Sequence, residues 1–205
     1  MERLRDDDDG WARVAALLDS GEVVAIPTDT VYGVAAAVRH PAAVARLFPL
    51  KDRDSNKPVA VLVDGVEQAA TVIVLDAVAG RLAAAEWPGA LTLVLPRSPE
   101  FDVDLGGAGD TVGVRLPDQT RVRELCRRVG PLATTSANRS GHPTPADGAG
   151  VASELDGTSI AAVLDAGSCA GAPSTVVRLD DGRVEVLREG PVDVENLISS
   201  LRDLT

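Results

Sequence analysis

Short apolar runs alternate with longer amphipathic segments along almost the whole chain. The runs are rich in Val, Leu, Ile and Ala and have the length of interior strands, and several stop at Pro, Gly or Asp. They predict strands over residues 23–26, 58–63, 91–95, 111–116, 132–135, 161–164, 175–179 and 184–187. The segments between them predict helices over residues 11–20, 41–48, 76–87, 118–128 and from 194 onward.

The order of these elements indicates a fold class. Asp181 and Gly182 lie between the last two predicted strands and have the chemistry of a tight hairpin turn. Helices interleave with strands elsewhere, yet a hairpin cannot belong to a purely parallel sheet. We therefore expect an α/β fold: a three-layer domain in which helices flank a twisted mixed sheet of about seven strands.

The chain shows no sign of a division into several domains. Composition changes too little after residue 10 to mark a linker, and the sequence has no internal repeat. We expect an acidic N-terminal arm over residues 1–10, followed by a single domain over residues 11–205. The carboxylates of Asp6 to Asp9 stand where the first helix begins, and the positive end of a helix favours them. The alternative is that these carboxylates bind a metal ion.

Charge limits the classes of partner. The chain carries 20 Lys and Arg against 31 Asp and Glu, a formal net charge of −11. This excess argues against stable binding to DNA or RNA, so any anion site must be local. No apolar run approaches the roughly 18 residues that a membrane span needs, and residues 1–10 are too acidic for a signal peptide. We expect a cytoplasmic protein that does not bind a membrane.

Several widespread catalytic motifs are missing. The sequence holds no G-x-x-x-x-G-K-[ST], G-x-G-x-x-G, G-x-S-x-G or H-E-x-x-H motif, which argues against the sites that these motifs build. Cys126 and Cys169 are too far apart for a zinc ribbon or a redox pair. We expect reduced thiols and no metal centre.

Two loops combine turn residues with hydroxyl and amide groups at the ends of predicted strands, where open α/β sheets place ligands. PTDTVYG, residues 27–33, offers Thr28, Thr30 and the phenol of Tyr32 to a small polar ligand, although a plain turn has the same composition. TTSANRSGHPTP, residues 134–145, opens into Ser, Asn and two prolines, a composition that favours a rigid loop with preorganised polar groups.

Cations form the remaining two candidate features. Lys51 and Lys57 are the only lysines, and with Arg53 they lie within seven residues. A charged loop that faces solvent is the ordinary explanation of such a cluster. Because lysine is scarce in this chain and the chain is acidic, the cluster favours an anion-binding site instead. Arg115 interrupts an apolar strand, so its guanidinium points either outward to water or into a cleft, where its planar fork fits a carboxylate.

Taken in order, these motifs resemble one family over about residues 11–192. The motifs are PTDTVYG, the K-x-R of Lys51 and Arg53, Lys57-Pro58, PGALTLVL, VGVRLP, the S-x-N of Ser136 and Asn138 with Ser140-Gly141, STVVRL and VLREG. The set is similar to the YrdC/TsaC family of threonylcarbamoyl-adenylate synthases. The resemblance implies a YrdC-like fold and the formation of threonylcarbamoyl-AMP and pyrophosphate from L-threonine, bicarbonate and ATP with Mg2+. It also implies supply of the threonylcarbamoyl group to tRNA adenosine 37 through a TsaD-type transferase complex.

The resemblance assigns roles to matching positions. For L-threonine the matching residues are Thr30, Arg115, Ser136 and Ser174. For ATP they are Lys51, Arg53, Lys57, Thr111, Asn138 and Arg188. Lys51 and Arg53 are the expected catalytic pair, because two cations beside the phosphates stabilise charge during phosphoryl transfer. Thr28, Tyr32 and Ser140 are candidate supporting residues.

Two positions depart from the family pattern. Leu62 stands where the family often has His or a similar polar residue, and Asp54 stands where Pro commonly follows the K-x-R. Three alternatives stand beside the synthase. One is a YciO-like paralogue on the same scaffold, and another is an RNA-binding module, although the acidic charge and the 2% aromatic content argue against it. The third is a carbamoyltransferase accessory domain of the kind found in hydrogenase-maturation proteins, but the zinc-finger cysteines of those longer chains are missing from this sequence.

Overall fold

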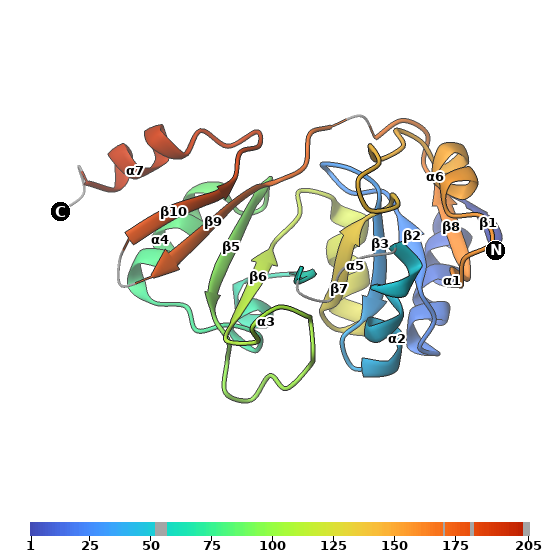
Figure 1. Ribbon diagram of the computed structural model, residues 1–205, viewed down its shortest axis with the longest axis horizontal. Helices are drawn as coiled ribbons and strands as arrows, with labels where there is room; N and C mark the ends of the chain where they lie inside the picture. The colour runs from blue at the N-terminus through green and yellow to red at the C-terminus, as the bar shows by residue number, and fades with distance from the viewer. Residues whose placement is uncertain (52–56, 170, 181–182, 203–205) are drawn as a thin grey trace.

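The computed structural model describes residues 1–51, 57–169, 171–180 and 183–202. A single mixed sheet runs through the molecule, and helices lie on both of its faces (Figure 1). This confirms the expectation of an α/β fold with a mixed sheet flanked by helices. In the described part of the chain no helix is long and apolar enough to cross a membrane.

Within the described residues the sheet has ten strands in the order β1-β8-β2-β3-β7-β4-β6-β5-β9-β10, so the expectation of about seven was too low. The strands are β1 (Glu2–Arg5), β2 (Val24–Ile26), β3 (Gly33–Ala37), β4 (Ala60–Leu62), β5 (Leu91–Pro96), β6 (Thr111–Arg115), β7 (Leu132–Ser136), β8 (Ala162–Asp165), β9 (Thr175–Asp180) and β10 (Arg183–Arg188). Parallel pairs such as β5–β9 and antiparallel pairs such as β9–β10 both occur.

Two strands had no signal in the hydrophobic pattern. β1 is a charged edge strand that pairs with β8, and it occupies part of the segment expected as an acidic arm. β3 has the sequence GVAAA, whose Gly and Ala are poor strand formers, yet it is buried between β2 and β7. The predicted turn at residues 181–182 lies outside the described residues.

The helices are α1 (Asp8–Asp19), α2 (Pro41–Arg46), α3 (Val66–Ala70), α4 (Ala77–Glu86), α5 (Thr120–Val129), α6 (Gly148–Glu154) and α7 (Val194–Arg202), with a 3-10 turn η1 (Pro49–Lys51). The start of α1 follows the predicted chemistry, because the carboxylate of Asp7 accepts a hydrogen bond from the backbone N–H of Gly10 at 2.8 Å. Asp76 caps α4 in the same way.

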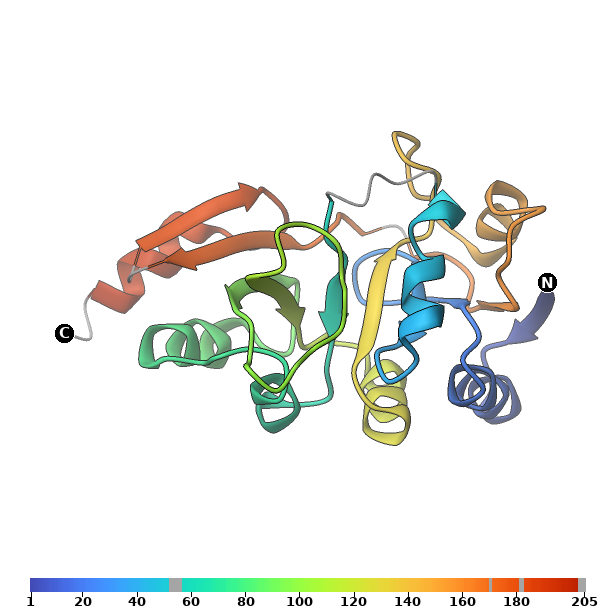
Figure 2. The same cartoon turned by 60° about the horizontal axis from the view of Figure 1, so that its bottom comes forward.

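In the half of the sheet that contains β2 and β3, successive residues of a strand face helices on opposite sides of the sheet. On β2 and β3, Val24 and Ala35 belong to the apolar cluster formed with α1 and α5. Their neighbours Ala25 and Val34 belong to the second cluster, which includes residues of α2, α3, α4 and α6. In Figure 2, α1, α5, α3 and α4 all run along the lower side of the molecule. Each strand of the sheet is rotated against its neighbour, and over ten strands the rotation adds up to on the order of 200°. The face that carries α1 and α5 in one half of the sheet and the opposite face, which carries α3 and α4 in the other half, therefore point to the same side of the molecule.

One half of the sheet is covered on a single face. Apolar residues of β4, β5, β6 and β9 join the cluster that holds α3 and α4. The alternate residues of the same strands line a cavity, and among them only Leu62 of β4 also packs in the cluster of α1 and α5. The uncovered face of this half of the sheet therefore positions the candidate site.

Close packing between β1 and α1 gives a test of the fold. A Cβ on Gly10 would lie 1.9 Å from the backbone oxygen of Arg5, so the chain would have to shift. We expect Gly10→Ala to lower the free energy of unfolding by about 1–3 kcal/mol, measured by urea denaturation. Gly80→Ala in α4 is the matched control, because nothing lies within 4 Å of its Cβ position. It should raise the free energy by about 0.5–1 kcal/mol, and equal stability of the two variants would contradict the packing.

Candidate functional site

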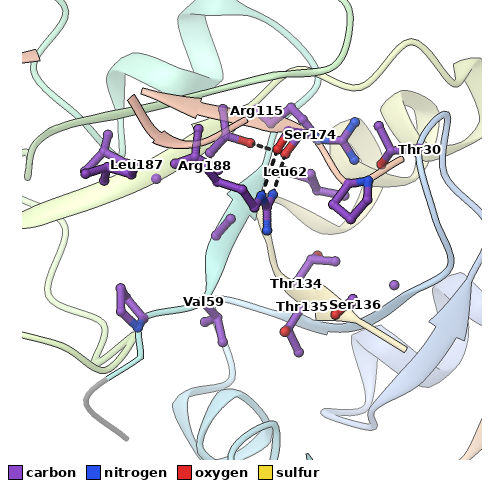
Figure 3. A pocket seen from close by; sticks show the side chains of 18 of the residues that line it. Thr30, Val59, Leu62, Arg115, Thr134, Thr135, Ser136, Ser174, Leu187 and Arg188 are labelled. Atoms are coloured by element: carbon purple, nitrogen blue, oxygen red, sulfur yellow. Dashed lines mark hydrogen bonds between the residues drawn. The ribbon is translucent and has the colours of Figure 1, made fainter. Parts of the chain in front are cut away.

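A cavity of about 290 Å3 lies on the uncovered face of the sheet (Figure 3). Residues of five strands form its floor. Every second residue of four strands takes part, which are Ala60 and Leu62 on β4, Thr111, Gly113 and Arg115 on β6, Thr92 and Val94 on β5, and Val176 and Arg178 on β9, and β7 adds the consecutive residues Thr134, Thr135 and Ser136. Loop residues including Thr28, Thr30 and Ser174 also line it. Hydroxyl groups and cations thus share one concave surface with small apolar side chains.

Arg115 lies in the cavity wall with only 5% of its surface exposed. Of the two orientations that the sequence left open, the structure has the one into a cleft. Nη1 donates to the carboxylate of Asp29 at 2.8 Å, and Nη2 lies 3.5 Å from the hydroxyl of Thr28. The side chains of the ion pair are 7% and 11% exposed, so water screens their attraction weakly.

The hydrogen bonds of Thr28 fix the role of Thr30. The hydroxyl of Thr28 donates its single proton to the carbonyl oxygen of Val31 at 2.6 Å. The hydroxyls of Thr28 and Thr30 are 3.1 Å apart, so Thr30 must be the donor between them. The oxygen of Thr30, which lines the cavity, therefore offers its lone pairs to a ligand N–H or O–H.

A second hydrogen-bond network lies in the same cavity, around Ser174. The Ser174 hydroxyl is 2.8 Å from the hydroxyl of Thr92 and accepts from Nη2 of Arg188 at 3.0 Å. Nε of Arg188 donates to the backbone oxygen of Ser174 at 2.9 Å, and Figure 3 shows the guanidinium folded back over this serine. Arg188 is otherwise exposed, so this contact joins an exposed cation to a buried hydroxyl.

The structure brings together all four residues that the resemblance assigns to L-threonine. Thr30, Arg115, Ser136 and Ser174 line the same cavity, although they come from the β2–β3 loop, β6, β7 and the segment before β9. Of the residues assigned to ATP, Thr111 and Arg188 also line it.

The other predicted residues lie elsewhere. Asn138 is 8% exposed and its amide donates to the carbonyl oxygens of Arg139 and His142, which holds its own loop together. Ser140 is exposed, and neither residue is among those described as lining the cavity. Lys57 is exposed beside Pro58, which does line it.

The side chains of the expected catalytic pair, Lys51 and Arg53, are outside what the structure describes. The backbone of Lys51 ends η1, but the placement of its side chain is not described. Arg53 and Asp54 fall within residues 52–56, which the structure does not describe. The roles of Lys51 and Arg53 stay predictions.

Tyr32 holds the loop without lining the cavity. Its side chain is fully buried, and its hydroxyl donates to the carbonyl oxygen of Gly167 at 2.9 Å and accepts from the N–H of Ala166 at 3.0 Å. Burial raises the pKa of this phenol, so it stays neutral and keeps both hydrogen bonds. Tyr32 thereby ties the β2–β3 loop to the segment after β8.

Neither cysteine has the environment of a nucleophile. Burial raises the pKa of the Cys126 thiol and that of the Cys169 thiol, so both are protonated at neutral pH. The Cys169 thiol donates to the carbonyl oxygen of Thr28 at 2.9 Å. Within the described residues, no three His, Cys, Asp or Glu side chains gather as a possible metal site.

Five polar residues in or near the cavity were not predicted as site residues. They are Asp29, Thr92, Thr134, Thr135 and Arg178. Thr92 and Arg178 had a usable signal, because each is a polar residue in an otherwise apolar strand, as Arg115 is. Asp29 had none beyond its place in PTDTVYG, since its partner lies 86 residues away.

The comparisons with known proteins agree with this architecture. A relative from Mycobacterium tuberculosis is 41% identical over 193 residues, which cover 94% of this chain and 89% of that protein. The threonylcarbamoyl-AMP synthase of Bacillus subtilis is 38% identical over 96% of this chain and 58% of its own length. The crystal structure of Pyrococcus abyssi Sua5 complexed with L-threonine aligns with a TM-score of 0.89 at 32% identity. That alignment covers 97% of this chain and 59% of the Pyrococcus chain.

A family profile covers most of the sequence. The profile described as "Telomere recombination", which groups Sua5, YciO and YrdC, matches residues 16–190. The match spans the β2–β3 loop, all five strands of the cavity floor and Arg188. Because it extends over far more than half of the residues and agrees with the sheet and its cavity, the chain belongs to the Sua5/YciO/YrdC family.

Proposed function

We propose that the protein is an L-threonylcarbamoyladenylate synthase, a nucleotidyltransferase that makes threonylcarbamoyl-AMP and pyrophosphate from L-threonine, bicarbonate and ATP. The observation that carries the proposal is the gathering of Thr30, Arg115, Ser136 and Ser174 in one cavity. Their chemistry matches an amino acid that has a carboxylate, an amine and a hydroxyl. The names of the relatives support the same reaction.

Each group of threonine has a suitable partner in the cavity. The guanidinium of Arg115 supplies donors for the carboxylate, since its planar fork matches two carboxylate oxygens. The lone pairs of Thr30 suit the amine or the hydroxyl, both of which donate. Ser136 and Ser174 offer further hydroxyl contacts.

ATP is assigned to the exposed side of the same cavity. Arg188 is exposed and lines it, and Lys57 lies beside its lining residue Pro58. With Lys51 and Arg53 these cations offset the charge of a triphosphate that arrives with its own Mg2+. Thr111 and Asn138 complete the set that the resemblance assigns.

The reaction needs positioned charge and no protein nucleophile. The threonine amine adds to CO2 derived from bicarbonate and gives a carbamate. An oxygen of the carbamate then attacks the α-phosphorus of ATP, and pyrophosphate leaves. The protein's contribution is to hold the carbamate in line and to stabilise charge on the phosphates. The neutral thiols of Cys126 and Cys169 agree with a reaction that has no covalent enzyme intermediate.

The product carries the group that modifies adenosine 37 of tRNA, so a TsaD-type transferase complex is the proposed consumer. Release of a small adenylate needs no nucleic-acid surface on this chain, and the net charge of −11 agrees with that. We place the protein in the cytoplasm, where its substrates and the tRNA occur.

The purified protein should form pyrophosphate and threonylcarbamoyl-AMP from ATP, Mg2+, bicarbonate and L-threonine, because the cavity carries partners for each group of threonine. Both products are measured by chromatography, with L-serine and no amino acid as controls. Pyrophosphate without threonine dependence would favour a paralogue with another acceptor. No turnover, together with salt-sensitive RNA binding, would favour the binding module.

Arg115→Lys should raise the KM for L-threonine by about tenfold or more, because Lys keeps the charge but loses the fork. The KM for ATP should change by less than about threefold, since Arg115 contacts the amino-acid side of the site. Steady-state pyrophosphate release measures both constants. Arg127→Ala on α5 is the control, because its guanidinium is exposed and pairs with Asp64 away from the cavity lining. An unchanged threonine KM in Arg115→Lys would move the carboxylate contact elsewhere.

Lys51→Ala and Arg53→Ala should each abolish pyrophosphate release and leave the fold intact, because both cations are assigned to the phosphates. Pyrophosphate release and circular dichroism give the two readouts. Near-normal rates in both variants would refute their assignment as the catalytic pair.

A further inference from the structure

The ion pair between Asp29 and Arg115 joins two parts of the chain that are 86 residues apart. Arg115 lines the cavity, whereas Asp29 is not among its described lining residues. Asp29 therefore reaches a ligand only through the guanidinium that it holds. We propose that Asp29 is a positioning residue, which turns the fork of Arg115 toward the carboxylate of the amino-acid substrate. This inference rests on the proposed function for its substrate.

The geometry leaves one edge of the guanidinium for a ligand. The carboxylate of Asp29 accepts a hydrogen bond from Nη1 of Arg115 at 2.8 Å, while Nη2 makes only a 3.5 Å contact with the hydroxyl of Thr28. A planar guanidinium presents two N–H groups on each edge. With Nη1 held by Asp29, the edge formed by Nε and Nη2 has a fixed direction, and a carboxylate fits such an edge with two parallel hydrogen bonds.

The loop that carries Asp29 is clamped on both sides of it. The Thr28 hydroxyl donates to the carbonyl oxygen of Val31 and accepts from the N–H of Thr30, which closes a tight turn around Asp29. The carbonyl oxygen of Thr28 accepts from the thiol of Cys169, and Tyr32 is tied to Gly167. The carboxylate is thereby preorganised, and binding need not order it.

Burial explains why the holding group is a carboxylate. Without a partner, the guanidinium of Arg115, which is 5% exposed, would carry a large desolvation cost before a substrate binds. Asp29 compensates that charge before the substrate arrives. The pair of Arg115 and Asp29 has no net charge, so it attracts a carboxylate little at long range. The substrate carboxylate is therefore recognised by the direction of the remaining N–H donors of Arg115.

The test compares two replacements of the same residue. Asp29→Ala removes the acceptor, so the threonine KM should rise by about tenfold or more. Asp29→Asn keeps an amide oxygen that accepts from Nη1, so its threonine KM should stay within about threefold of the wild-type value. The KM for ATP should change by less than about threefold in both variants. Asp64→Ala is the matched control, because it removes the partly buried carboxylate that pairs with Arg127 away from the cavity, and its threonine KM should not change.

A second readout does not depend on turnover. Side-chain NMR of the guanidinium, assigned from the signal lost in Arg115→Lys, should show slow rotation about Nε–Cζ in the wild type and in Asp29→Asn. The rotation should be fast in Asp29→Ala. If the wild type shows no threonine-dependent turnover, the proposed function fails while this measurement still decides whether Asp29 holds Arg115.

Three results would overturn the inference. The first is a threonine KM in Asp29→Ala within about twofold of the wild-type value. The second is an equal rise of the threonine and ATP constants, which is what general damage to the cavity would cause. The third is an Asp29→Asn variant as impaired as Asp29→Ala, because positioning by an acceptor oxygen predicts rescue.

Discussion

The site depends on how the two faces of a strand are covered. Successive side chains of a strand point to opposite faces, so a strand packed against helices on one face only has every second position available for other contacts. β6, β5 and β9 are in this situation, because their apolar residues pack in the cluster that holds α3 and α4 and the cavity occupies the other face. Val112 and Val114 serve the core, while Thr111, Gly113 and Arg115 between them form the floor of the cavity. Core and site are therefore interleaved in the same five residues of β6.

Polar side chains on such a floor are stable only when they have partners, because a buried donor or acceptor without one costs free energy. Arg115 has Asp29, and Ser174 has both Thr92 and Arg188. These contacts within the protein also fix the directions of the remaining donors and acceptors of the same groups. Stability of the cavity and preorganisation for a substrate thus come from the same hydrogen bonds.

Most of the fold and part of the site could be predicted from the sequence. Eight of the ten strands had an apolar run, whereas β1 and β3 did not, since the charged ERLR and the alanine-rich GVAAA form strands only through their neighbours in the sheet. Thr30, Arg115, Ser136 and Ser174 were predicted through ordered motifs. The pairing of Asp29 with Arg115 was not, because no local pattern reports a contact that the chain makes only after folding. Tyr32 lies in a loop that was predicted to hold site residues. Its side chain is buried, and its hydroxyl ties that loop to Gly167.

The charges around the cavity match two substrates of different character. An amino acid at neutral pH is a zwitterion, so it needs an oriented donor for its carboxylate and acceptors for its amine but no net charge. The buried pair of Arg115 with Asp29, beside the acceptor oxygen of Thr30, has this character. A triphosphate carries several negative charges and needs a positive field, which the exposed Arg188 and Lys57 begin to supply. Under the proposed function, an acidic protein binds both substrates because the groups assigned to threonine act through direction and those assigned to ATP through local positive charge.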